Sequence, residues 1–336
     1  MSDTVGSPSV RPSVCLKIPL LLTTVSVFLL GHFYFPGDTR AFGIRRGKLQ
    51  ESPPWWDGGP CPCRDTHCMQ RHSLPLTMEG VGGTCGRRAW ASGERQRVIT
   101  YSLFGNKTKY WEGLDDIMRT AKKLYPGWKV WIYTKPRGRE HLLCPLLHAH
   151  PHLFICDVTN LPPPLGDVTS INPRMWRFLP MSDGHLSAMV VRDSDSQIIE
   201  REAAAVREWL SCNRSFHLMR DHPFHGAPVL GTLGRPDLKA LRDTMATLGR
   251  SRLAARDQDQ QVLAKVLWPV MKSHVIAHDS FRCNLYPEGT RPFPTRREGG
   301  EYVGNKIYTK KNDRLLVKKK CPVECRPLLH LDWFYC

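Results

Sequence analysis

The sequence predicts an α/β domain in which helices flank a mostly parallel sheet, and two observations carry this prediction. From residue 97 to residue 305, short apolar runs typical of strands alternate with segments whose apolar residues recur at helical spacing. The composition is that of a globular protein, since 41% of the 336 residues are hydrophobic and 24% are charged. A collagen-like or wholly disordered chain is therefore excluded.

The start of this region predicts a β-α-β unit. Residues 98–104 (VITYSLF) predict a strand. In the following KYWEGLDDIMRTAKKLYPG, apolar residues fall on one helical face, and Pro126-Gly127 ends the helix. Residues 128–134 (WKVWIYT) alternate as a second strand.

The alternation continues to the end of the region. We expect further strands at 153–158, 186–191, 216–220 and 273–278, and helices at 200–210, 237–248 and 257–267, the last ended by Trp268-Pro269. These elements predict a single, mostly parallel sheet. Ligands of such sheets collect at the carboxyl ends of the strands, so the residues after each strand are the candidates for chemistry.

The N-terminal part predicts a membrane anchor and a stem. Residues 18–35 (IPLLLTTVSVFLLGHFYF) carry no formal charge and are long enough to span a bilayer. We expect a cytosolic tail at 1–17, a transmembrane signal anchor at 18–35 and a stem at 36–96, rich in Pro, Gly and charge. A cleaved signal peptide or a buried helix are the alternatives. The domain at 97–305 is followed by a basic, cysteine-containing tail at 306–336.

The orientation of this anchor rests on the cysteines and on two glycosylation triplets. Positive charges on both sides of the apolar segment favour, by their count, the opposite topology. However, Asn106-Lys107-Thr108 and Asn213-Arg214-Ser215 are acceptor triplets for N-glycosylation. Of the 12 cysteines, only Cys15 precedes the segment, and disulfides belong to oxidising compartments. We therefore expect a single-pass type II membrane protein with a short cytosolic tail and a lumenal body.

The eleven cysteines after the anchor are an odd number, so at least one is free or pairs between chains, which would allow a homo-oligomer. Disulfides are the expected state of the cluster CPCRDTHC, with a metal knuckle as the alternative, and of the three cysteines of the tail. The residues concerned are Cys61, Cys63, Cys68, His67 and His72 in the cluster, and Cys321, Cys325 and Cys336 in the tail.

The formal charge of +17 suits phosphates, polyanions or anionic membrane surfaces. No recognisable nucleic-acid-binding module accompanies it, so we expect no nucleic-acid partner. Within the tail, KIYTKKNDRLLVKKK would suit an acidic glycan, but a solvated basic face is the simpler interpretation.

Two carboxylates follow the strand at 186–191. Asp193 and Asp195, in RDSDS, can converge on one hard divalent cation, Mn²⁺ or Mg²⁺, that keeps open positions for phosphate oxygens. An acidic turn that caps the next helix is the alternative interpretation.

The anchor, the stem, the β-α-β start and the DSD after a strand together resemble Golgi-type glycosyltransferases of the GT-A (nucleotide-diphospho-sugar transferase) fold, within a poorly characterised subgroup. The resemblance covers residues 97–305. It rests on YSLFGNKTKYWEG, YPGWKVWIYT, RDSDSQIIEREAAAVREWL, HLMRDHPFHGAPVLG, DQQVLAKVLWP and HDSFRCN with PFPTRR and YVG.

The resemblance implies roles for individual residues. Asp193 and Asp195 match the pair that binds Mn²⁺ or Mg²⁺ and, through it, the diphosphate of a nucleotide-sugar donor. Tyr101 and Ser102 stand where such enzymes hold the base and the ribose. His278 is a candidate third metal ligand, although a lone histidine is more often a core or capping residue.

The acceptor side is less defined. Asp221 is a candidate base or positioning carboxylate facing the acceptor hydroxyl, and a plain ion pair with Arg220 is the alternative. Asp259 and Gln260 match a pair that lines the sugar pocket in similar enzymes, although acidic residues also favour helix starts. Arg174 and Arg177 could neutralise a diphosphate, but surface charges are the simpler interpretation.

The sequence thus predicts metal-dependent transfer of a sugar from a nucleotide-sugar to a glycan, glycoprotein or glycolipid acceptor. A catalytically inactive sugar-binding relative is the first alternative, because VLGTLGRPDLK stands where similar proteins have a Gly-Gly-x-Trp-Gly stretch. The second is a lumenal metal-dependent hydrolase with six ligands: Asp193, Asp195, Asp221, His222, His225 and His278.

Overall fold

The computed structural model describes residue 61 and residues 83–163, 165–229, 258–287, 289–306 and 316–336. The predicted cytosolic tail and membrane anchor, most of the predicted stem and the predicted helix at 237–248 lie outside these residues. Within the described part of the chain, none of the helices is long and apolar enough to cross a membrane.

The central sheet has four strands, all parallel, in the order β3-β2-β1-β4. Its strands are β1 (Gln96–Ser102), β2 (Lys129–Thr134), β3 (Leu153–Asp157) and β4 (Leu186–Arg192). Nearly every residue of these strands is buried, as expected for a parallel sheet covered on both faces. The predicted α/β fold, with a parallel central sheet flanked by helices, is confirmed.

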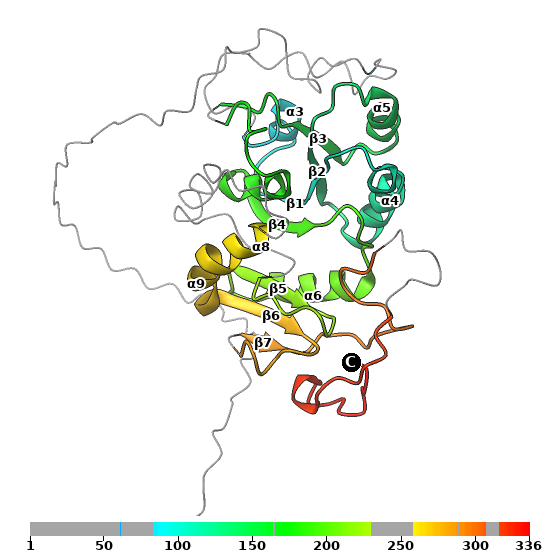
Figure 1. Cartoon of the computed structure of the whole chain (residues 1–336), viewed down its shortest axis with the longest axis vertical. Coiled ribbons are helices and arrows are strands. Elements are labelled where there is room, and N and C mark those ends of the chain that lie inside the picture. Colours follow the sequence, from blue (N-terminus) through cyan, green and yellow to red (C-terminus); the bar gives the residue numbers. More distant parts are fainter. Residues whose placement is uncertain (1–60, 62–82, 164, 230–257, 288, 307–315) are drawn as a thin grey trace, which may run out of the picture.

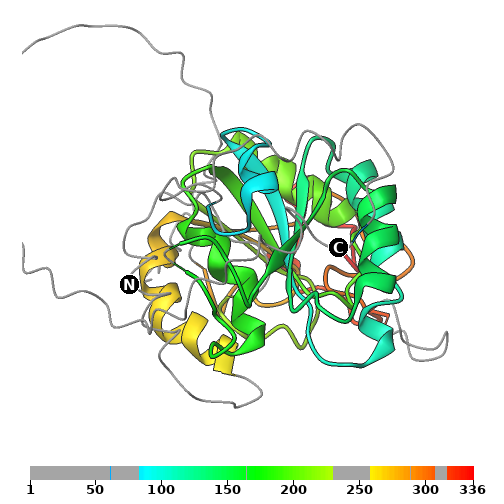
Figure 2. The same ribbon diagram turned by 90° about the horizontal axis from the view of Figure 1, so that it is seen from above.

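Helices cover both faces of this sheet (Figures 1 and 2). Alternate strand residues point to opposite faces, so Ile99 and Tyr101 join one core while Val98 joins the other. The first core is closed by α4 (Leu114–Leu124), α5 (Glu140–Ala149) and α6 (Glu200–Ser211). The second is closed by the 3₁₀ helix η3 (Pro173–Ser182), the π-helical η4 (Leu263–Leu267) and α9 (Trp268–Met271).

A second, smaller sheet continues the parallel arrangement. It consists of β5 (Phe216–Arg220), β6 (Val275–Asp279) and the two-residue β7 (Thr290–Arg291), in that order. The expectation of one continuous sheet is therefore wrong in this respect, since β4 and β5 do not pair. Alternation along a sequence predicts parallel strands, but it does not say which strands share a sheet.

Helix boundaries differ from expectation where prolines occur. The sequence pattern did not predict α5, which contains Pro145, or η3, which begins at Pro173 and contains Pro180. The helix expected to end at Trp268-Pro269 continues through η4 into α9, because proline is tolerated in the first turn of a helical segment. The remaining short helices are α3 (Arg87–Trp90), η2 (Thr108–Tyr110), α8 (Gln258–Val262), η5 (Lys272–His274) and η6 (Val323–Cys325).

Every cysteine within the described residues is disulfide-bonded, which confirms the disulfide prediction for Cys61 and for the tail. The bonds are Cys61–Cys144, Cys85–Cys156, Cys283–Cys325 and Cys321–Cys336, and Cys212 is disulfide-bonded as well. Cys15, Cys63 and Cys68 lie outside the described residues, so an unpaired cysteine and the homo-oligomer it would allow stay predictions.

The end of the predicted stem belongs to the folded body. Residues 83–96 carry α3 and the start of β1, and Cys85 is fully buried in its bond to β3. Thr84 donates from its backbone N–H and its hydroxyl to Asp183 Oδ2, at 2.8 and 2.9 Å. These contacts hold the segment against the central sheet.

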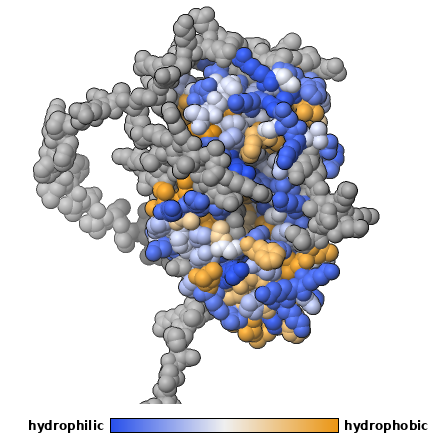
Figure 3. Space-filling view, viewed as in Figure 1, coloured by the Kyte–Doolittle hydropathy of each residue, from blue (hydrophilic) through white to orange (hydrophobic). Residues whose placement is uncertain are grey.

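The C-terminal segment, residues 316–336, is fastened to the second sheet. Cys283–Cys325 links it to the chain after β6, and Cys321–Cys336 closes it on itself. Some of its apolar side chains stay exposed, Leu328 and Leu329 most of all. Figure 3 shows orange apolar residues interspersed with blue polar ones in the lower part of the molecule, where Figure 1 places this segment.

Gly289, beside β7, is a position that only glycine fits. Its φ is +63°, and a Cβ there would lie 2.0 Å from the carbonyl oxygen of Val275. We predict that Gly289→Ala lowers the free energy of unfolding by about 3 kcal/mol, because backbone must shift as well as adopt a strained φ. Gly138→Ala is the matched control, since its φ is +78° with nothing within 4 Å, and it should cost about 1 kcal/mol. Equal costs in urea unfolding would contradict the steric argument.

Candidate functional site

The candidate site lies at the carboxyl ends of β1 and β4. These strands are parallel neighbours in which Tyr101 pairs with Arg192, so Ser102 and Asp193 follow at the same edge of the sheet. The Asp193 side chain is 62% exposed and can meet a ligand. This is the edge at which open α/β sheets bind ligands.

Arg177, from η3, joins the residues at this edge. Its backbone N–H donates to Ser102 Oγ at 2.9 Å, and its guanidinium bonds to Asp193 Oδ1 and to Asp259 Oδ2, the latter at 3.2 Å. The Arg177 side chain is only 11% exposed, so the interpretation as a surface charge is wrong. The Arg177 guanidinium also holds the pKa of the Asp193 carboxyl below its ordinary value.

Two polar atoms, one on Arg177 and one on the residue after Asp259, lack a partner in the described residues. Arg177 Nε and Gln260 Oε1 are buried and make no hydrogen bond within that part of the chain. Buried polar groups in folded proteins are nearly always paired, and an unpaired one costs about 1–3 kcal/mol.

Asp195 meets a lysine from the basic tail. Its Oδ2 lies 3.6 Å from Nζ of Lys306, and an antiparallel bridge between Ser196 and Lys306 brings the two segments together. A further bond runs from the Gln197 N–H to the Asn305 carbonyl at 2.8 Å. At least this lysine of the basic run therefore belongs to the candidate site. No sequence pattern indicates it, because nothing links residues 195 and 306 except the folded chain.

Asp193 and Asp195 have carboxylate oxygens of the kind that Mn²⁺ or Mg²⁺ binds. The predicted third ligand lies elsewhere. His278 is fully buried in β6, with its Nδ1 2.7 Å from His217 Nε2 and its Nε2 3.1 Å from Glu208 Oε2. In the residues that the structure describes, no three or more His, Cys, Asp or Glu side chains are grouped to hold a metal ion. The six-ligand arrangement expected of a hydrolase is thus not formed.

Tyr101 and Asp259 occupy different environments. The Tyr101 side chain lies in the first core, is fully buried, and has a hydroxyl without a hydrogen-bond partner among the described residues. Burial raises its pKa far above the ordinary value, so it stays neutral. Asp259, at the start of α8, faces the site through its ion pair with Arg177.

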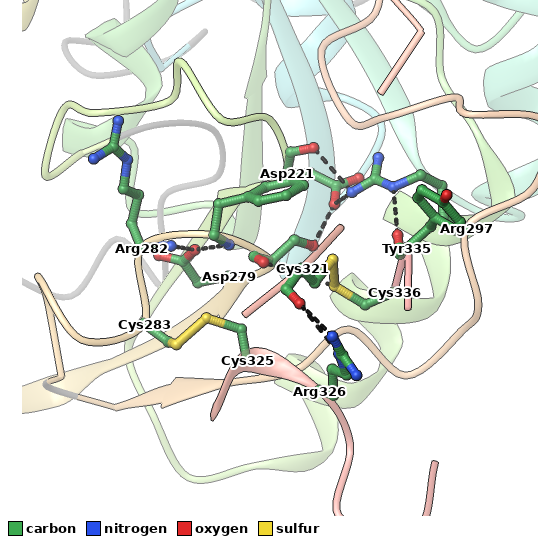
Figure 4. Close-up of a disulfide and its surroundings, with 12 residues drawn as sticks. Asp221, Asp279, Arg282, Cys283, Arg297, Cys321, Cys325, Arg326, Tyr335 and Cys336 are labelled. Atoms are coloured by element: carbon green, nitrogen blue, oxygen red, sulfur yellow. Dashed lines mark hydrogen bonds and ion pairs between the residues drawn. A yellow bond between two sulfur atoms is a disulfide. The ribbon is translucent and has the colours of Figure 1, made fainter. Parts of the chain in front are cut away.

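Asp221 is the centre of a buried ion network rather than a solvent-facing carboxylate (Figure 4). Arg201 of α6 pairs with both of its oxygens at 3.0 and 3.1 Å, and Arg297 approaches Oδ1 at 2.6 Å. The Ser280 hydroxyl and the Val303 N–H donate to it as well, at 2.7 and 3.0 Å. A general base needs a lone pair free to accept a proton, so we propose no catalytic step for Asp221.

The pKa of Asp221 agrees with this structural role. Burial alone would raise the pKa of its carboxyl, but the charges of Arg201 and Arg297 outweigh burial and hold it below the ordinary value. Arg297 in turn donates from Nε to the carbonyl of Tyr335, so the disulfide-closed tail supports the network (Figure 4).

Comparisons with known proteins add a distant structural neighbour. No protein-family profile matches the chain, and no curated protein matches it either. Among solved structures, the chain is similar to a glycosyltransferase involved in the glycosylation of the major capsid of PBCV-1. The two share 12% identity with a TM-score of 0.33, over 58% of this chain and 89% of that one. A likeness of this size carries no conclusion about activity.

The roles of Asp221 and Asp193 predict effects of different size on stability. We expect Asp221→Asn to lower the free energy of unfolding by about 3–5 kcal/mol, because two buried arginines lose their counter-charge. Asp193→Asn should change it by less than about 1 kcal/mol, since that carboxylate is largely exposed. Urea unfolding monitored by circular dichroism measures both changes in free energy. A small effect of Asp221→Asn, similar to that of Asp193→Asn, would contradict the structural role of Asp221.

His225 predicts a pH dependence of stability. Its Nδ1 accepts the Asp221 N–H at 3.1 Å, and burial lowers its pKa to about 4. The unfolded histidine titrates near pH 6.5, so its contribution is fully present above that pH and is lost as the pH falls toward 4. Between pH 7 and pH 5 the loss from this group amounts to about 2 kcal/mol.

His225→Asn keeps an acceptor at the position of Nδ1 but does not titrate there. The difference in unfolding free energy between pH 7 and pH 5 should therefore shrink by about 2 kcal/mol in this variant. The lowered pKa of Asp221 has no effect in this window, because it acts only below about pH 4. An unchanged difference would show that folding does not lower the pKa of His225.

Proposed function

We propose that the chain is a metal-dependent glycosyltransferase of the GT-A type, which transfers a sugar from a nucleotide-diphosphate sugar to a glycan, glycoprotein or glycolipid acceptor. The observation that supports it most is the convergence of Ser102, Arg177, Asp193 and Asp259 at the carboxyl edge of the central sheet.

In this proposal, different residues bind the metal, the diphosphate, the ribose and the sugar of the donor. Asp193 and Asp195 would hold Mn²⁺ or Mg²⁺, which neutralises charge on the leaving diphosphate. Arg177 presents a guanidinium fork suited to phosphate, and Lys306 adds a second positive charge. Ser102 Oγ accepts the backbone N–H of Arg177, and Ser102 stands where the ribose would lie. Asp259 and Gln260 line the sugar side.

Charge balance favours this assignment over a purely structural ion cluster. Arg177 and Lys306 face three carboxylates, Asp193, Asp195 and Asp259, so without a ligand the site carries an excess of negative charge that a cation would offset. A divalent cation with a diphosphate brings charges of both signs, and the carboxylates can turn to the metal while the cations turn to phosphate. Such an exchange of partners needs side chains that can move, and Asp193 and Lys306 are 62% and 63% exposed.

We place the protein in the Golgi membrane, as a single-pass type II protein with a lumenal body. The disulfides of the described residues support an oxidising compartment. The apolar segment at residues 18–35 would supply the membrane anchor.

The test measures nucleotide release by the full chain in detergent micelles, with a panel of UDP- and GDP-sugars, each with and without Mn²⁺. We expect metal-dependent release from one donor, reduced about a hundredfold or more in Asp193→Asn and in Asp195→Asn, because the charged leaving group loses its stabilisation. Asp116→Asn is the control, since this exposed carboxylate lies on α4, away from the site.

The outcomes separate the candidate functions. Failure of all donors to bind, with or without metal, would overturn the transferase. Donor or glycan binding without any turnover would favour the inactive sugar-binding relative. Release that needs no metal and is unchanged in Asp195→Asn would remove the metal from the proposal.

A further inference from the structure

Three rings come together beside the candidate site. His222 and His225 follow β5, and Tyr302 comes from the segment before the tail. Their ring centroids lie 4.5 Å apart for His222 and Tyr302, 5.6 Å for the two histidines, and 5.8 Å for His225 and Tyr302. The proposed donor site uses none of them, so their grouping has no explanation yet.

Backbone hydrogen bonds fix the protonation of both histidines. His222 Nδ1 accepts the Phe224 N–H at 3.2 Å, and His225 Nδ1 accepts the Asp221 N–H at 3.1 Å. An imidazole whose Nδ1 accepts a hydrogen bond is neutral and carries its proton on Nε2. Burial also lowers the pKa of both rings, which keeps them neutral at physiological pH. Each ring therefore offers one Nε2–H donor.

These donors have no partner within the described part of the chain. Within those residues, the Nε2 atoms of His222 and His225 and the hydroxyl of Tyr302 make no hydrogen bond. The fully buried polar atoms without a hydrogen-bond partner do not include these three. The three polar atoms thus reach the surface of the protein, although His222 and Tyr302 as whole residues are each only 7% exposed. Nearly buried rings with free polar tips are typical of a ligand subsite.

The residues just after Tyr302 link the three rings to the turn that carries Asp193 and Asp195. Gly304, two residues after Tyr302, accepts the Ser196 hydroxyl at 3.4 Å through its carbonyl. A Cβ on Gly304 would lie 3.7 Å from Cε1 of His225, so this residue touches both groups. Lys306, two residues further on, reaches Asp195. The three rings therefore lie next to the carboxylates of the candidate site.

We infer that His222, His225 and Tyr302 form a subsite for a sugar ring. A sugar ring has an apolar C–H face that packs against ring faces and hydroxyl oxygens that accept from N–H donors. The inference rests on the proposed function in one respect, namely that the neighbouring carboxylates serve a sugar transfer. The buried network of Asp221 holds the subsite, because Asp221 binds His225 through its own N–H and binds the Val303 N–H next to Tyr302.

Conservative substitutions can remove the polar tips and leave the support intact. His225→Asn and His222→Asn keep an acceptor for the backbone N–H while removing the Nε2–H donor. Tyr302→Phe keeps the ring and removes the hydroxyl. His330→Asn and Tyr335→Phe are matched controls, because these side chains are exposed on the tail.

The experiment is saturation-transfer NMR on the full chain in micelles, with methyl glycosides of glucose, galactose, mannose and N-acetylglucosamine as probes. We expect saturation of at least one glycoside. Its dissociation constant should rise about tenfold in each histidine variant and severalfold in Tyr302→Phe, as for a lost hydrogen bond. The two controls should bind as the unmodified chain does. Unchanged thermal unfolding at pH 7.5 checks that the variants are folded.

Three results would overturn the subsite. They are no binding of any glycoside, binding that the three variants leave unchanged, or tight binding of Zn²⁺ alone that His225→Asn abolishes, which would make the histidines metal ligands. Different outcomes would overturn the proposed function and the subsite. If the rings bind sugar but no nucleotide-sugar binds, the subsite stands and the transferase falls. If Asp193→Asn abolishes turnover but the ring variants bind sugar normally, the transferase stands and the subsite falls.

Discussion

The carboxylate of Asp221 is the interaction on which the arrangement of the site depends. Arg201 brings α6 to it, Arg297 brings the disulfide-closed tail, and Ser280 brings the chain after β6. Its remaining bond, to the Val303 N–H, fixes the segment that continues to Lys306. A single buried charge thus joins four separate parts of the chain. Burial of such a charge is costly unless it is fully paired, and here both carboxylate oxygens are paired.

This network divides the molecule into support and site. The support consists of groups whose charges are buried and paired with one another, such as Asp221 with its two arginines, or Arg220 with Asp279. The site consists of charges that remain partly exposed and could change partners, such as Asp193 and Lys306. The distinction has a physical basis, because a fully paired buried group cannot exchange its partner for a ligand without a large loss of stability.

The sheet and the disulfides add rigidity where the site needs it. β1 and β4 lie in one parallel sheet, so their carboxyl ends present Ser102 and Asp193 side by side. Two disulfides link the C-terminal segment to the chain after β6 and to itself, and its Tyr335 carbonyl accepts a hydrogen bond from Arg297. At Gly304 the backbone has a φ of +93°, a conformation that favours glycine, and its carbonyl accepts the Ser196 hydroxyl.

The sequence by itself determined the α/β class, most strands and the edge where chemistry collects. Periodicity is a local property, and 216–220 therefore appears as the strand β5 with unchanged bounds. Asp193 and Asp195 became candidates from their places after a strand, and Asp259 became one through the family resemblance. Local pattern also placed Asp221 and His278 as candidates, because each follows or ends a strand.

Only the tertiary structure decided what these side chains face. Asp221 and Asp193 both follow a strand, but two arginines distant in sequence surround one while solvent reaches the other. The pairing of Lys306 with Asp195, the burial of Arg177 and the meeting of Tyr302 with two histidines also join residues that lie far apart along the chain. Residue types and spacing name the groups that could do chemistry. Whether a charge is paired, buried or open to a ligand depends on contacts that a linear pattern does not contain.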